Sequence, residues 1–113
     1  MVARNSLSEA PPYAVESALR RLGQDLRTAR LRRNLTLDDA AAKIGAGRRA
    51  VADAERGKPT TAIATYAALL WAYGLLEGFG GVADPSGDVE GMTLARSSER
   101  TRARAPGTLN NDF

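Results

Sequence analysis

The stretch from residue 35 to residue 58 constrains the fold of this chain most, because it encodes two short helices around a tight turn. Thr36 can cap the first helix, and Asp39 stands where the carboxylate of a capping box belongs. Gly45 can adopt the positive φ that a sharp helix end requires. The stretch is therefore predicted to form a packed helix pair. The side chains spaced to lie on its inner faces are Ala41, Ile44, Val51 and Ala54.

The second of these helices opens with two adjacent arginines, Arg48 and Arg49. A bracing helix, a tight turn and a second helix with exposed N-terminal side chains form the pattern of a DNA-reading helix-turn-helix. Arginine suits that task because it can donate two parallel hydrogen bonds to guanine O6 and N7. The pattern predicts that the second helix contacts base edges.

At these residues the segment resembles the helix-turn-helix of the Cro and lambda-repressor superfamily, also called the xenobiotic-response-element (XRE) family. Ala41, Gly45 and Val51 stand where that family has a small residue, a turn glycine and a buried branched residue. Residues 55–58, Glu-Arg-Gly-Lys, match its usual exit from the recognition helix. The resemblance covers about residues 21–82 and implies an all-α fold, a five-helix lambda-repressor-like domain.

Docking as in that family would point Arg48, Arg49 and Asp53 into the major groove. The two arginines lie about 100° apart on a helix, so we expect one to read bases and the other to touch phosphate. Asp53 could accept a hydrogen bond from cytosine N4 or orient an arginine one turn earlier. Arg56 and Lys58, just past the helix, are expected at phosphates.

Two residues depart from the family pattern. Leu37 replaces a polar residue that often touches phosphate, and Gly47 replaces the serine or threonine that usually caps the recognition helix. Gly47 is still expected to lie at the DNA, but both departures should weaken the contacts to the DNA backbone. The family commonly pairs a glutamate like Glu55 with an arginine on the first helix. Arg30 stands at the matching place, and the resemblance implies a structural ion pair.

Composition narrows the possible functions. The 113 residues support one small domain with tails and contain no cysteine and no histidine. Disulfides, thiolate metal sites and the commonest general base are thereby excluded, so we expect no enzyme, metal or cofactor. No apolar run approaches the ~18 residues of a membrane span. Residues 20–58 carry eleven basic and five acidic residues, a net charge of +6, which favours a nucleic-acid partner. The expected location is the cytoplasm, at the nucleoid.

The chain divides, on this evidence, into a flexible N-terminus over 1–11, a DNA-binding domain over 12–83 and a loop with a basic tail over 84–113. A first helix is predicted from Pro12 to near Arg33, with Gly23 as a candidate kink and Asn34 as a left-handed stop. The apolar stripe that predicts this helix is formed by Val15, Leu19, Leu22, Leu26 and Ala29.

A fourth helix is predicted to begin at residues 59–61, with Thr60 or Thr61 as its cap, and to end at Gly74. Trp71 stands where the family has a charged, exposed residue, so it would close a homodimer, anchor a second protein or pack locally against the first helix. The expected inner face of this helix is formed by Ile63, Tyr66, Ala67, Leu70 and Tyr73.

A short, very apolar final helix is predicted next, serving as a lid on the core or as a dimer seam. It contains Leu75, Leu76, Phe79 and Val82. Residues 84–88 have turn chemistry, residues 89–94 would form one short strand or stay irregular, and residues 97–113 are predicted to be a disordered basic tail.

The whole layout resembles the HipB-type antitoxins, which bind operators upstream of their own operon and hold a HipA-type kinase toxin. The stretches that carry this resemblance are residues 27–33, 74–79, 84–85 and 91–104. It implies a homodimeric transcriptional repressor on an inverted-repeat operator of double-stranded DNA. Two alternatives stay open: a stand-alone phage-type XRE regulator without a toxin partner, and a protein-interaction module that does not bind DNA.

Overall fold

The structure, a computed structural model, describes residues 6–104, and within this range it contains helices and no strand. The prediction of an all-α chain is confirmed. The predictions for residues 1–5 and 105–113 lie outside the described residues. The elements are α1 (Ser6–Glu9), α2 (Tyr13–Arg32), α3 (Leu37–Ile44), α4 (Arg48–Glu55), α5 (Ile63–Ala72), the 3-10 helices η1 (Glu77–Gly81) and η2 (Pro85–Gly87), and α6 (Val89–Arg104).

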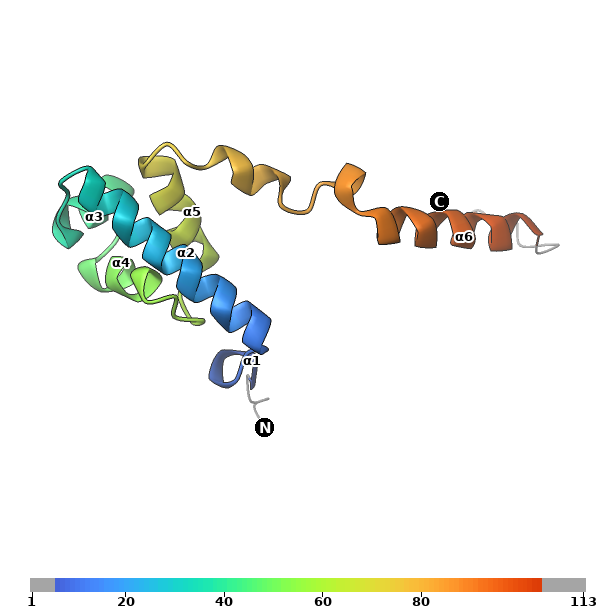
Figure 1. Ribbon diagram of the computed structural model, residues 1–113, viewed down its shortest axis with the longest axis horizontal. Helices are drawn as coiled ribbons and strands as arrows, with labels where there is room; N and C mark the ends of the chain where they lie inside the picture. Colours follow the sequence, from blue (N-terminus) through green and yellow to red (C-terminus); the bar gives the residue numbers. More distant parts are fainter. Residues whose placement is uncertain (1–5, 105–113) are drawn as a thin grey trace. The chain divides into compact units, whose positions relative to one another are not determined.

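The chain divides between Phe79 and Gly80 into two compact units, here called the N-terminal and the C-terminal unit. The sequence placed the domain boundary a few residues later, after residue 83. Figure 1 shows α2 to α5 in the N-terminal unit and α6 in the C-terminal unit. Residues 6–9, expected to be flexible, form the single turn of α1, none of whose residues is buried.

Helix α2 runs unbroken for 20 residues, as its apolar stripe predicted, but the stripe is buried only in its later part. Leu26 and Ala29 are buried, whereas Val15 is exposed. The helix is not split at Gly23, the candidate kink, and Gly23 has another role. A methyl carbon there would lie 2.6 Å from the carbonyl oxygens of Ala54 and Glu55, so the glycine lets α4 approach α2 closely.

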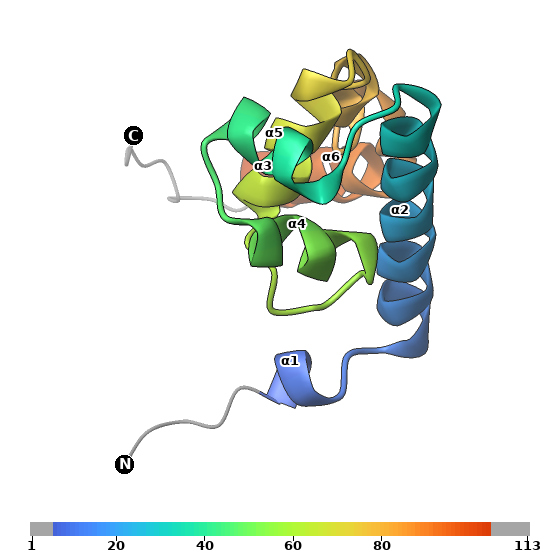
Figure 2. The ribbon, with the colours of Figure 1, turned by 90° about the vertical axis from the view of Figure 1, so that its left-hand side faces the viewer.

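The helix pair α3 and α4 follows the local signals in the sequence. Thr36 Oγ1 accepts from Asp39 N and Asp39 Oδ2 accepts from Thr36 N, which completes the predicted capping box. Gly45 ends α3 with φ +69°, and Asn34 ends the turn after α2 with φ +54°, both as predicted. Helix α4 then lies at the centre of the unit, in contact with α2, α3 and α5 (Figure 2).

The core of the N-terminal unit is small and comes from helices α2 to α5 and the residue that ends α5. Leu26, Val51 and Leu69 are its largest fully buried side chains. Among the described residues, the buried apolar ones are Leu26, Ala29, Ala40, Ala41, Val51, Ala54, Tyr66, Leu69 and Tyr73.

Helix α5 begins later than predicted, and its inner face differs. Ala62, not Thr60 or Thr61, precedes it, with no side-chain cap, because residues 58–61 form a turn closed by a hydrogen bond from Thr61 N to Lys58 O. Ile63 is exposed and Leu69, which was not predicted to face inward, is fully buried. The segment is apolar on nearly every side, so its periodicity could not identify the buried face.

The final apolar helix expected over residues 75–82 is instead the five-residue 3-10 helix η1. Three glycines within this segment, Gly78, Gly80 and Gly81, disfavour a regular α-helix. Leu75, Phe79 and Val82 are exposed and Leu76 is half-buried. The segment therefore does not cover the core with these side chains, as a lid would.

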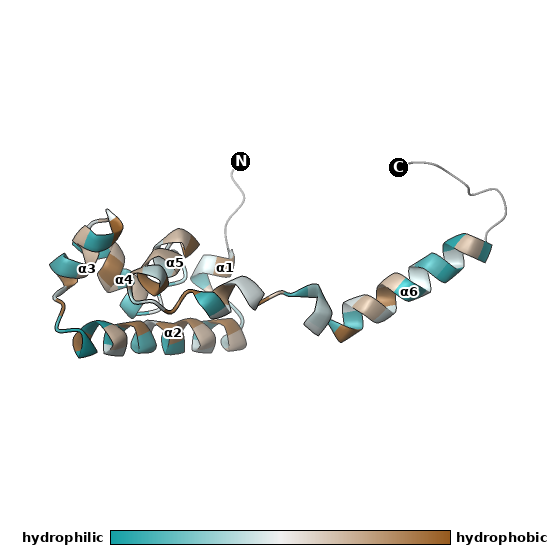
Figure 3. Cartoon of the chain, turned by 90° about the horizontal axis from the view of Figure 1, so that it is seen from above, coloured by the Kyte–Doolittle hydropathy of each residue, from teal (hydrophilic) through white to brown (hydrophobic). Residues whose placement is uncertain are grey.

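The C-terminal unit was predicted wrongly in its main element. Residues 89–94, expected as a strand or irregular, and residues 97–104, expected to be disordered, together form α6. Asp88 assists its start by accepting a hydrogen bond from Gly91 N. Residues 92–104 contain no glycine or proline, and they include four arginines and two alanines, residue types that favour helix. No residue of α6 is buried, and the cartoon in Figure 3 shows hydrophilic and hydrophobic residues alternating along this helix.

Candidate nucleic-acid interface

The N-terminal end of α4 presents two free cations. Gly47 precedes the helix with an extended backbone and no side-chain cap, as its residue type requires. Arg48 and Arg49 follow at the first two helical positions, and both side chains are exposed. Among residues 6–104, no hydrogen bond or ion pair engages either guanidinium. The helix end therefore offers backbone N–H groups and two unpaired guanidinium groups to an anionic partner.

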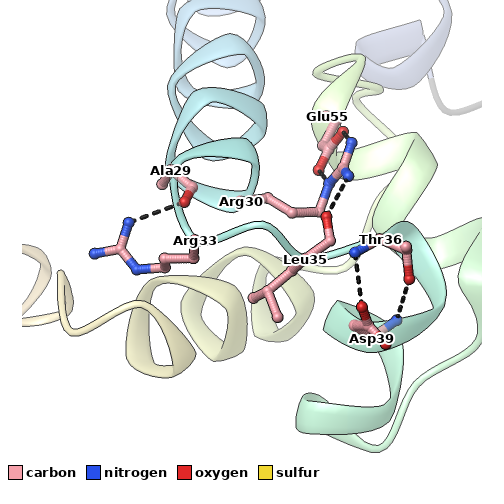
Figure 4. A network of polar contacts seen from close by, with 7 residues as sticks. All are labelled: Ala29, Arg30, Arg33, Leu35, Thr36, Asp39 and Glu55. Atoms are coloured by element: carbon pink, nitrogen blue, oxygen red, sulfur yellow. Dashed lines mark hydrogen bonds and ion pairs between the residues drawn. The ribbon is translucent and has the colours of Figure 1, made fainter.

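The C-terminal end of α4 is anchored to α2 by the ion pair that the family resemblance implied. Arg30 Nε donates to Glu55 Oε2 at 2.6 Å and Arg30 Nη2 donates to Glu55 Oε1 at 3.0 Å, and each side chain is 8% exposed (Figure 4). The hydrogen bonds with Glu55 raise the pKa of Arg30 above the ordinary value of an arginine. Arg30 Nη1 also donates to Leu35 O at 2.9 Å. One guanidinium thus fixes α2, α4 and the connection to α3.

Asp53 lies between the two cations that follow α4. It forms an ion pair with Arg56, and Asp53 Oδ2 lies 3.8 Å from Lys58 Nζ. Within residues 6–104, Asp53 forms no ion pair with an arginine one turn earlier, which was one of its two predicted roles; its partners are Arg56 and Lys58. The Asp53 side chain is 17% exposed, whereas that of Arg56 is 63% exposed and can reach an external anion.

The turn after α4 is held by the inner helix α5. Tyr66 Oη donates to Lys58 O at 3.2 Å, and the ring of Tyr66 is buried in the core. That burial raises the pKa of the Tyr66 phenol. The backbone that carries Lys58 is thereby tied to the core, while the Lys58 side chain remains half exposed.

Arg33 is a structural residue that the sequence reasoning missed. Its guanidinium donates to Ala29 O and to Tyr73 O, both at 2.9 Å, and lies 5.5 Å from the centroid of the Tyr73 ring. It thus joins the end of α2 to the end of α5. The signal was present, since a basic residue at a helix C-terminus commonly binds the last free carbonyls.

A second group of side chains in the N-terminal unit, close together in sequence, is apolar rather than charged. Trp71 is 63% exposed, Leu75 50% and Phe79 37%, and Leu76 beside them is half-buried. Trp71 is therefore no part of the core, which removes local packing as the explanation of this tryptophan. These four residues are called the Trp71 surface below.

Residues 6–104 contain no group of three or more acidic side chains placed to hold a metal ion. No helix in the same range combines the length and the apolarity needed to cross a bilayer.

Comparisons of the chain with protein-family models, with curated proteins and with solved structures found no match in any of the three.

Proposed function

We propose that this protein binds duplex DNA sequence-specifically through a lambda-repressor-like helix-turn-helix, with α3 as the bracing helix and α4 as the reading helix. One observation carries the proposal: α4 is fixed to α2 at its C-terminal end by a buried ion pair, while Arg48 and Arg49 stand free at its N-terminal end. Reading a base edge requires such a rigid helix with unpaired donors at the tip.

The side chains divide into base-reading and phosphate-binding groups under this proposal. Arg48 or Arg49 would contact guanine, and a good bidentate contact contributes roughly 1–3 kcal/mol of discrimination between bases. Gly47 would let a phosphate approach the free amides of α4. Arg56 and Lys58 would bind phosphate, positioned by Asp53 between them. The net charge of +6 over residues 20–58 supports the same assignment.

Homodimerisation is part of the proposal, and the Trp71 surface is its candidate seam. A single domain of this size offers few base contacts, and proteins of this kind bind two half-sites about 34 Å apart, or multiples of that spacing. An exposed tryptophan with neighbouring leucine and phenylalanine side chains is the kind of patch that interfaces bury. The operator would then be an inverted repeat, and the bound dimer would act as a cytoplasmic transcriptional repressor at the nucleoid.

The toxin-antitoxin role is the narrower proposal. A HipB-type antitoxin would hold a HipA-type kinase toxin, and the Trp71 surface would serve that partner if it is not the dimer seam. A stand-alone regulator needs no such partner. Copurification of the tagged protein from its native host separates the two: a kinase-sized companion lost in Trp71→Ala supports the antitoxin, and DNA binding with no companion supports the stand-alone regulator.

Selection of DNA fragments from the host genome, at modest salt, tests the central function. The expected result is enrichment of one inverted repeat. Competition titrations with that repeat and a scrambled duplex should then show that Arg48→Ala or Arg49→Ala lowers the specificity ratio. Arg27→Ala, which removes the same charge from the exposed side of α2, should leave that ratio unchanged. Failure to enrich any repeat would refute the proposal.

A further inference from the structure

The C-terminal half of α6 carries a regular stripe of arginines. Arg96, Arg100 and Arg104 follow one another at intervals of four, so they line one face of the helix. Arg102, two positions from Arg100, points to the other side of the helix. All four side chains are exposed. The stripe extends over about two turns of helix, roughly 12 Å.

This stripe is an unfavourable arrangement for a helix that only meets water. Like charges four residues apart repel one another and destabilise a helix. Within residues 6–104, no ion pair or hydrogen bond compensates the guanidinium groups of Arg96, Arg100 or Arg104. Glu99 is the only acidic residue between Arg96 and Arg104. A polyanion laid along the helix would offset this repulsion.

The side chains around the stripe fit a phosphate backbone better than a protein surface. Ser97, Ser98, Thr101 and Ala103 are all small, and no aromatic or large aliphatic side chain lies between Arg96 and Arg104. Protein interfaces take most of their affinity from buried aromatic and large apolar anchors, which this segment lacks. Phosphate contacts are made by arginine and by small hydroxyl side chains.

We propose that the stripe formed by Arg96, Arg100 and Arg104 is a second DNA-binding element, which contacts backbone phosphates without reading sequence. It rests on the proposed DNA-binding function and adds affinity to it rather than specificity. Each neutralised phosphate contributes about 0.9 to the slope of log affinity against log salt, so three contacts contribute about 2.7. Between ~50 and ~200 mM salt, this corresponds to a roughly 40-fold share of the loss of affinity.

Salt titrations with a mixed-sequence duplex of about three helical turns, roughly 100 Å, test the stripe. In the full-length chain, Arg96→Ala/Arg100→Ala/Arg104→Ala should reduce the slope by about 2.7. Arg100→Ala alone should reduce it by about 0.9, and the matched variant Arg102→Ala, on the opposite face, should leave it unchanged. Circular dichroism should show equal or greater helix content in the triple variant, since alanine favours helix and the repulsion is gone.

The outcomes separate this inference from the proposed function. If the wild-type protein binds the duplex and the triple variant keeps the wild-type slope, the stripe is not a DNA-binding element, although the function stands. If Arg100→Ala and Arg102→Ala reduce the slope equally, the effect is net charge and the stripe is refuted. If the wild-type protein binds no duplex at all, the proposed function itself fails. A triple variant with unchanged DNA slope that loses an acidic protein partner would assign the stripe to that partner instead.

Discussion

The two units of the chain are both helical, but different interactions stabilise the helices within each unit. In the described part of the N-terminal unit, nine buried apolar residues and one buried ion pair bring α2 to α5 together across long stretches of sequence. In the C-terminal unit, residues 80–104 include no buried side chain. The contrast shows that tertiary packing stabilises the helices of the N-terminal unit, whereas local sequence signals produce the helix of the C-terminal unit.

Local hydrogen bonds define the C-terminal unit. Asp84 accepts from Ser86 N and Asp88 accepts from Gly91 N, contacts that span two and three residues. An isolated helix of about 16 residues is marginally stable in water, because nucleation is costly and packing contributes nothing. Changes in the N-terminal unit should therefore alter cooperative unfolding, and comparable changes in the C-terminal unit should not.

The largest expected effect is at the buried ion pair. Glu55→Ala leaves the Arg30 guanidinium buried without its partner, which typically costs about 3–5 kcal/mol of the free energy of unfolding. Glu16→Ala removes an exposed partner of Arg20 and should cost about 0.5 kcal/mol or less. Urea denaturation of both variants measures the difference. Equal stabilities would mean that the Arg30–Glu55 pair contributes no more than a solvated one.

Two glycines with the same backbone conformation give the next comparison. Gly57 and Gly45 both have φ +69°, but a methyl carbon at Gly57 would lie 2.5 Å from Leu19 O, whereas nothing lies within 4 Å at Gly45. Gly45→Ala should cost only the left-handed penalty, about 1–2 kcal/mol. Gly57→Ala should cost about 1–3 kcal/mol more, because α2 must move. Thermal unfolding of the two variants would contradict this explanation if Gly45→Ala were the less stable.

A smaller effect is expected from acid. Hydrogen bonds from Thr36, first from its backbone N–H, lower the pKa of Asp39 below its ordinary value of 3.8. Asp39 therefore stabilises the fold above that value, and the contribution is lost as the pH falls through the lowered pKa. Asp39→Asn should reduce the acid sensitivity of the urea midpoint between about pH 6 and about pH 3.

Asp84 is the control for this measurement. Its pKa is lowered in the same way, by hydrogen bonds from Ser86, but it belongs to the C-terminal unit. Asp84→Asn should leave the pH dependence of the cooperative transition unchanged. A matching change in both variants would show that the two units unfold together.

The smallest effect is expected from the end of the chain. Deleting residues 97–113 removes the described segment 97–104, which contains no buried side chain. The free energy of unfolding of the N-terminal unit should change by less than about 0.5 kcal/mol, the usual range for surface changes. Denaturation followed by the fluorescence of Trp71 reports this unit alone. A clear loss of stability would contradict the independence of the two units.

The parts of the fold predicted correctly are those that local residue signals determine. The capping box at Thr36 and the left-handed glycine at Gly45 fix both ends of α3. The pairing of Arg30 with Glu55 was expected from the family resemblance alone, since no local pattern joins residues so far apart. Gly23 was misread because its reason, close approach to α4, exists only in the tertiary structure.

The errors occur where sequence signals are weak or ambiguous. Helix α5 is apolar on most sides, so Leu69 could not be told from Ile63 as a core residue. Residues 97–104 of α6 were predicted to belong to a disordered basic tail because they offer almost nothing to bury, although the composition of this segment favours helix. The partners of Asp53 depended on the path of the chain after α4, which brings Arg56 and Lys58 to the carboxylate.

The DNA-reading role of α4 is tested most directly by following the backbone amide NMR signals of the N-terminal unit during titration with duplex DNA. The largest shifts are expected at residues 46–50, around Gly47, Arg48 and Arg49, with smaller shifts near Arg56 and Lys58. Titration of Arg48→Ala with the same duplex should diminish the shifts at this helix end. Shifts confined to the Trp71 surface, or no shifts at low salt, would contradict a reading role for α4.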